Sequence, residues 1–150
     1  MALDLRAAAD LPCALAVARA ELQTLDGYPM WLGIVHRVAG ADAHPDDPGP
    51  AWWVDLGGRV GVLRKTKRVR MVRTALVEEL IRFERLELDG RTHNSWVLEA
   101  HLESRGPGRT GLDMAVHYGG DRRLPVLDAV LRAEVGRAGR RLAERVSGVG

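Results

Sequence analysis

The longest regular pattern in the chain is an apolar stripe near its carboxyl end. Between Arg122 and Val146, apolar residues recur every three or four positions, which is the spacing of one face of an α-helix. The stripe consists of Leu124, Leu127, Leu131, Val135, Ala138, Leu142 and Val146. The other faces of this predicted helix carry mainly charged residues and should meet water. A stripe of about seven turns needs a large apolar surface to lie on.

Alternation of apolar and polar residues predicts seven strands before that helix. They cover residues 2–9, 34–39, 51–60, 63–75, 80–88, 92–104 and 110–118. An alanine-rich helix over 11–25, with Asp10 as its N-cap, and a short helical turn over 28–32 separate the first two strands. Short turns, among them Asp89-Gly90, join the last five strands, which predicts an antiparallel meander.

Three segments predict irregular backbone. Gly57-Gly58 predicts a bend or bulge inside the third strand. The alternation in 80–88 changes phase after Phe83, which predicts a bulge or a strong twist there. Residues 40–50 hold three prolines and two glycines, and are the segment most expected to be disordered.

A twisted sheet of seven strands curls, and the final helix must fill the resulting groove. The predicted fold class is therefore α+β, with a curved seven-stranded antiparallel sheet wrapped around a long C-terminal helix. Two short helices lie between strands 1 and 2. One helix rarely fills such a groove, so we expect a residual cavity between helix and sheet.

Length and composition indicate one globular domain over residues 1–150. The chain is 46% apolar and 28% charged, with a net charge of +2. No apolar run reaches 18 residues, and the first residues do not resemble a signal peptide, so we expect a cytoplasmic protein without stable membrane insertion. The lone Cys13 excludes an internal disulfide and a cysteine zinc site, and a buried thiol is favoured over a reactive one.

The order of elements resembles the helix-grip fold of the START-like, or SRPBCC, superfamily, and in particular its polyketide cyclase/dehydrase and coenzyme-Q-binding branch. Residues 25–31 (LDGYPMW) resemble that family's segment of an aspartate followed by Tyr-Pro-x-Trp. The likeness continues through 70–73, 81–85, 93–96, 110–112 and 118–120. It covers essentially the whole chain.

This resemblance implies a deep apolar pocket under the last helix. Members bind lipids, polyketides, quinones or other hydrophobic molecules, and a minority cyclise or dehydrate polyketide chains. No catalytic motif is common to the superfamily, so no catalytic residue is transferred to this chain. The Trp-x-Ser-x-Arg cluster of single-domain aromatase/cyclases is missing, because Ser95-Trp96 has another order and spacing.

The expected ligand-binding residues come from the inward faces of the strands and from the final helix. They are Trp52, Met71, Arg73, Phe83, Asn94, Trp96, Met114, Tyr118, Leu127 and Leu131. Aromatic walls and adaptable methionines suit an apolar ligand, although the same residues also suit a plain packed core. The alternative function is a polyketide cyclase/dehydratase, in which Arg73 holds an enolate oxygen and Tyr118 donates a proton.

Other polar clusters carry less weight. His101 and His117 face outward on adjacent strands, but no metal or cofactor is expected there. A basic run comprises Arg64, Lys65, Lys67, Arg68, Arg70 and Arg73. No aromatic residue interleaves with it, so we expect a solvated edge or convex face and no nucleic acid partner. An acidic protein partner and a homodimer are left open. Gly136 and Gly139 lie inside the predicted final helix, where glycine lowers stability. They predict either that a strand or one of the first helices approaches this helix closely, or that the helix has a hinge.

Overall fold

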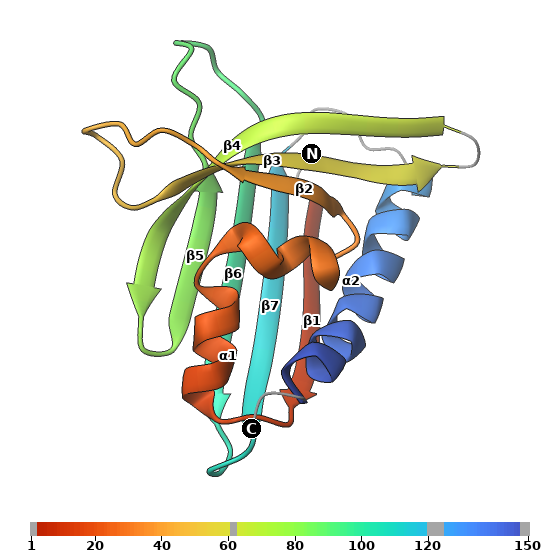
Figure 1. Cartoon of the computed structure of the whole chain (residues 1–150). Helices are drawn as coiled ribbons and strands as arrows, with labels where there is room; N and C mark the ends of the chain where they lie inside the picture. Colours follow the sequence, from red (N-terminus) through yellow and green to blue (C-terminus); the bar gives the residue numbers. More distant parts are fainter. Residues whose placement is uncertain (1–2, 61–62, 120–124, 148–150) are drawn as a thin grey trace.

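The seven strands form one antiparallel sheet in the order β1-β7-β6-β5-β4-β3-β2 (Figure 1). The computed structural model describes residues 3–60, 63–119 and 125–147. Its elements are β1 (Leu3–Leu11), α1 (Leu15–Leu22), the 3-10 helix η1 (Leu25–Met30), β2 (Val35–Gly40), β3 (Ala51–Val60), β4 (Leu63–Val77), β5 (Leu80–Arg85), β6 (Ser95–Ser104), β7 (Thr110–Gly119) and α2 (Pro125–Ser147). The predicted fold class and the predicted meander of the last five strands are both confirmed.

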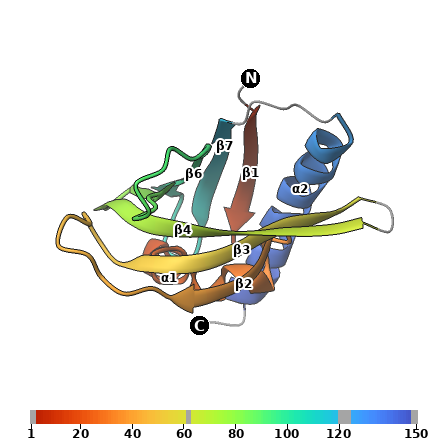
Figure 2. The same cartoon turned by 90° about the horizontal axis from the view of Figure 1, so that it is seen from above.

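The sheet curls so strongly that β2, β3 and β4 cross in front of β5, β6, β7 and β1 (Figures 1 and 2). The core fills the space between these two parts of the sheet. α1 and η1 cover one side of this space, and α2 runs along β1 on the other side. The two short helices therefore close the concave side at the point where α2 does not reach.

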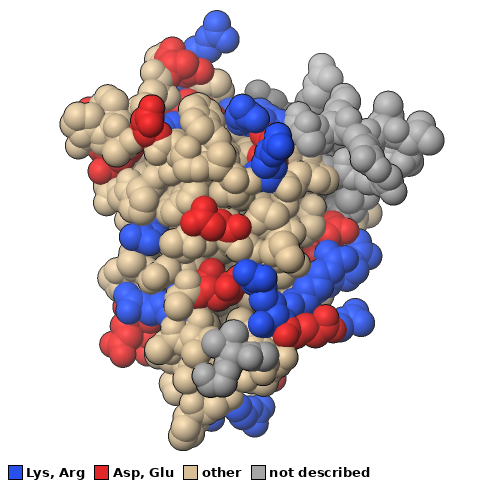
Figure 3. Space-filling view, in the orientation of Figure 1, with Lys and Arg blue, Asp and Glu red and all other residues tan. Residues whose placement is uncertain are grey.

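α2 is held close to the sheet by its carboxyl half. Its stripe residues Val135, Ala138, Leu142 and Val146 are buried, as predicted. The side chains of Leu124, Leu127 and Leu131 lie outside the described part of the chain. Exposed arginines gather along the helix, interspersed with glutamates (Figure 3). None of the described helices is long and apolar enough to cross a membrane.

The first helix is shorter than predicted. β1 continues to Leu11, and Asp10 pairs with Gly111 of β7 instead of capping a helix. The N-cap of α1 is Ala14, which makes no side-chain capping bond. The prediction of an N-cap at Asp10 was wrong because pairing with β7 extends the strand past that residue. A helical turn is present as η1, but it begins at Leu25 and ends at Met30, whereas the predicted turn covered residues 28–32.

The bulges lie one strand away from the predicted positions. Gly57 and Gly58 pair with β4 in continuous register, so the predicted irregularity is absent from that pairing. The register instead shifts between Val35 and Arg37 in β2 and between Arg73 and Ala75 in β4. The phase change after Phe83 marks the end of β5, because the following residues 86–94 form a loop that is longer than a tight hairpin.

The segment 41–50, predicted to be disordered, is tied to the outer face of the sheet. The guanidinium of Arg70 on β4 lies 2.6 Å from the Asp47 carboxylate and also donates to the Asp42 and Leu86 carbonyls. Arg70 is only 1% exposed. The prediction that the basic run is solvated was therefore wrong at Arg70, because a distant loop folds over it and supplies the counter-charge.

Candidate functional site

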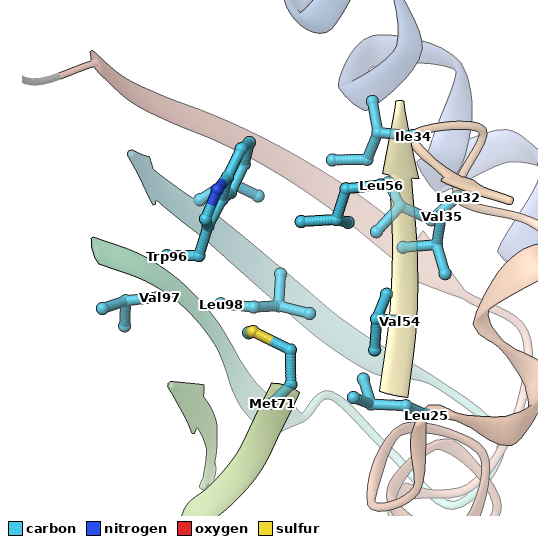
Figure 4. A pocket seen from close by; sticks show the side chains of 11 residues that line it. Leu25, Leu32, Ile34, Val35, Val54, Leu56, Met71, Trp96, Val97 and Leu98 are labelled. Atoms are coloured by element: carbon cyan, nitrogen blue, oxygen red, sulfur yellow. The ribbon is translucent and has the colours of Figure 1, made fainter. Parts of the chain in front are cut away.

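An apolar pocket lies between the two parts of the curled sheet (Figure 4). η1, the segment before β2, and strands β2, β3, β4, β6 and β7 all contribute to its wall. The lining residues are Leu25, Leu32, Ile34, Val35, Val54, Leu56, Met71, Trp96, Val97, Leu98 and Val116. None of these side chains is charged. Such a wall fits an apolar ligand and disfavours a buried ion.

The pocket is narrow. The empty space in the pocket, including the part that is open to solvent, is about 370 Å³. The volume within which the centre of a water molecule can lie is only about 30 Å³. That smaller volume corresponds to roughly two waters. A ligand larger than this needs wall side chains to move. Met71 has a flexible thioether, and Trp96 is only half-buried, so these two residues are the most adaptable part of the wall.

Trp96 and Tyr118 form an aromatic pair beside the pocket. They face each other across β6 and β7, with ring centroids 4.6 Å apart and planes inclined by 35°. The Asn94 amide donates to the Tyr118 hydroxyl at 3.3 Å, which fixes the orientation of the phenol. The indole N–H of Trp96 is buried and has no acceptor among the described residues. The pocket itself exposes no polar surface, so this N–H does not face the cavity.

Three other expected ligand-binding residues lie away from this wall. Trp52 and Phe83 stack edge-to-face with centroids 5.6 Å apart and belong to a buried aromatic cluster with Tyr28 and Trp31. Met114 lines a second void under α2, where about 10 Å³ is open to the centre of a water molecule. The side chains of Leu127 and Leu131 are outside the described part of the chain.

The Arg73 guanidinium points to α1 instead of the pocket. Its Nη1 donates to the Gln23 carbonyl at 2.7 Å, where α1 ends. Burial, together with the nearby charge of Arg19, lowers the pKa of Arg73. The arginine therefore caps a helix and is not available to hold a ligand oxygen in the apolar pocket.

Sequence reasoning missed the pocket residues that come from outside the long strands. Leu25, Leu32 and Ile34 belong to η1 and to the segment that follows it, which the curl of the sheet brings over the cavity. The family-like segment 25–31 was the one available signal, but it does not specify which side chains face inward. Val97 lines the pocket from a position of outward parity on β6.

The histidines and the cysteine do not assemble a reactive centre. His117 bonds to Asp4 at 2.7 Å and His101 to Glu99 at 3.0 Å, and the two histidines are not opposite each other in the β6–β7 register. Within residues 3–60, 63–119 and 125–147, no three histidine, cysteine or acidic residues are grouped to hold a metal ion. Cys13 is buried, and burial raises the pKa of its thiol.

Comparisons with known proteins identify the fold. No family model and no curated protein matches the sequence. A START superfamily protein from Mycobacterium smegmatis is 11% identical with a TM-score of 0.73, covering 98% of this chain and 99% of that one. The protein TTHA0849 from Thermus thermophilus is 15% identical with a TM-score of 0.72, covering 99% of both chains. Zhui aromatase/cyclase from Streptomyces sp. R1128 is 16% identical with a TM-score of 0.60, covering 99% of this chain and 93% of that one. The chain has the START-like helix-grip fold, and at these identities the likeness shows the fold alone.

Proposed function

We propose that this START-like chain binds a hydrophobic small molecule, of lipid, quinone or polyketide type, in the pocket lined by Met71 and Trp96. The observation that carries the proposal is a wall made only of apolar side chains inside the curl of the sheet. Burial of apolar ligand surface against such a wall is favourable by roughly 25 cal/mol per Å². As part of this proposal, the chain acts as a single cytoplasmic domain.

The wall also restricts the ligand's chemistry. An ionised group has no counter-charge among the described lining residues, so the buried part of the ligand is uncharged. The indole N–H of Trp96 needs an acceptor. A ligand with one carbonyl or ether oxygen reaches this donor when the Trp96 ring turns toward the pocket, and it then gains a hydrogen bond worth about 1 kcal/mol.

The second candidate is a polyketide cyclase or dehydratase acting in the same pocket. The fold is similar to that of an aromatase/cyclase, and the Asn94-oriented hydroxyl of Tyr118 stands beside the pocket as a proton donor. Turnover of a poly-β-keto substrate that is lost in Tyr118→Phe favours this candidate. Binding without turnover favours the first.

Native mass spectrometry of gently purified protein, followed by solvent extraction, tests the proposal. A bound mass in the range of a lipid, quinone or polyketide supports it and gives the ligand class. A ligand-free mass is followed by titration with a panel of uncharged apolar molecules that carry one carbonyl, monitored by tryptophan fluorescence. Absence of saturable binding across that panel overturns the proposal.

A further inference from the structure

The arginines of this chain divide into those that have a carboxylate partner and those that do not. Among the described residues, five arginines are buried or half-buried. Three of them pair with a carboxylate: Arg70 with Asp47, Arg82 with Glu99, and Arg85 with Glu87. The other two, Arg19 and Arg73, have no carboxylate of the described residues within ion-pair distance, although burial makes an unpaired charge costly.

These two exceptions meet at one place, the end of α1. Arg19 lies one turn before Gln23, whose N–H donates to the Arg19 carbonyl at 2.9 Å. Arg73 reaches the Gln23 carbonyl from β4 at 2.7 Å. Arg19 and Gln23 are four residues apart and therefore lie on the same face of the helix end. Burial, and then the charge of Arg19, lower the pKa of Arg73. Two like charges therefore share a half-buried junction between α1 and β4.

The surrounding groups neutralise only part of this charge. The carboxyl end of a helix carries a partial negative charge, which favours cations there, but α1 has only eight residues. Its one acidic side chain, Glu21, is engaged by Arg145 of α2. The Nε of Arg19 is buried without a hydrogen-bond partner among the described residues. The junction thus holds an unused donor and two positive charges.

We infer that Arg19 and Arg73 form a binding site for a phosphate group at the junction of α1 and β4. Planar guanidinium groups donate two parallel hydrogen bonds to such anions, and two of them match a doubly charged phosphate. Neither arginine lines the apolar pocket, so this site is distinct from the one in the proposed function. Its occupant is a free anion or the acidic group of a larger organic molecule.

Calorimetric titration with inorganic phosphate at constant ionic strength tests the site. We expect saturable binding to the wild-type protein that is at least about tenfold weaker in Arg19→Gln. Arg19→Gln is the more informative substitution, because the Arg19 side chain makes no hydrogen bond to a described residue. Arg73→Gln would also remove the hydrogen bond that caps α1. Arg82→Gln is the matched control, since Arg82 is a half-buried arginine that already has a carboxylate partner, and it should bind phosphate as the wild type does.

A second titration uses a short-chain monoalkyl phosphate to separate the two sources of the anion. Equal affinity for the alkyl and inorganic phosphates indicates a free anion, and clearly tighter binding of the alkyl phosphate indicates the acidic group of an organic molecule. In both cases, the affinity for the phosphate must fall in the Arg19→Gln variant. The inference is overturned if the wild type shows no saturable binding of either phosphate, or if Arg19→Gln binds them equally well.

Discussion

The rings of Trp96 and Tyr118 pack against each other across β6 and β7 with a centroid separation of 4.6 Å. This aromatic pair connects the apolar pocket, which Trp96 lines, to the hydrogen bond between Asn94 and Tyr118. The indole presents its apolar surface to the pocket, while its N–H is buried without an acceptor among the described residues. The phenol hydroxyl accepts a hydrogen bond from the Asn94 amide. Under the proposed function, we expect Trp96 to contribute to ligand recognition.

Trp96→Phe should weaken the binding of a ligand that carries a hydrogen-bond acceptor by about five- to tenfold, because the indole donor is lost while the aromatic wall is kept. Isothermal titration calorimetry measures this change in affinity, because its signal does not depend on the fluorescence of the substituted tryptophan. Trp31→Phe is the matched control, since its indole N–H is also buried and unpartnered among the described residues but lies outside the pocket. Equal effects of the two substitutions on affinity would contradict a recognition role for the Trp96 donor.

Two buried methionines allow the pocket to be separated from the rest of the core. Met71→Trp should abolish ligand binding at a smaller cost in stability than Met114→Trp, because the pocket that Met71 lines is larger than the void beside Met114. Met114→Trp should instead destabilise the protein by about 1–3 kcal/mol, because the void beside Met114 is too small for an indole.

Urea denaturation and native mass spectrometry of both variants provide the two measurements. The methionines are 5% and 3% exposed, so differences in burial do not explain a different outcome. Equal destabilisation by both substitutions, with ligand binding retained in Met71→Trp, would indicate a filled core at this position.

The Arg70–Asp47 ion pair should make the protein sensitive to acid. The hydrogen bond from the Arg70 side chain, helped by the backbone N–H of His44, lowers the pKa of Asp47 from 3.8 to about 2. A lowered carboxyl pKa gives stability that is present above pH 4 and is lost as the pH falls towards 2.

Asp47→Asn should therefore be less stable than the wild type at neutral pH and show a flatter dependence between pH 4 and pH 2. Urea unfolding midpoints across that range measure the difference. Asp55, Asp89 and Glu99 also have a lowered pKa, so the wild-type slope does not vanish in the variant. Identical slopes in the two proteins would show that the pair does not contribute to acid stability.

The two glycines of α2 should respond differently to the same substitution. A Cβ at Gly136 meets open space, so Gly136→Ala should stabilise the protein by about 1 kcal/mol through helix propensity. A Cβ at Gly139 would lie 3.0 Å from the Ala9 Cβ on β1, so Gly139→Ala should lose that gain. Thermal unfolding compares the pair, and an equal rise in both variants would mean that α2 does not press on β1 at Gly139.

The sequence alone determined the sheet and the long helix because their signals are local. Trp52, Val54 and Leu56 share one parity along β3 and are all buried, as predicted from that parity. Short connections force consecutive strands to pair, and the spacing of Val135, Ala138 and Leu142 places one face of α2 on the core. These features can be predicted without knowing which other segments pack against the strand or the helix.

The tertiary structure decided which residues meet across long distances in the chain. Arg70 is buried because Asp47, 23 positions away, folds over it, and no local pattern encodes that pairing. Leu25 and Leu32 reach the pocket only because the curl of the sheet brings η1 over the cavity. Arg73 caps α1 by donating to the carbonyl of Gln23, which lies 50 positions earlier in the chain. Hydrophobic alternation specifies which face of a strand is buried, but the curvature of the sheet sets which buried faces touch and how much space they leave.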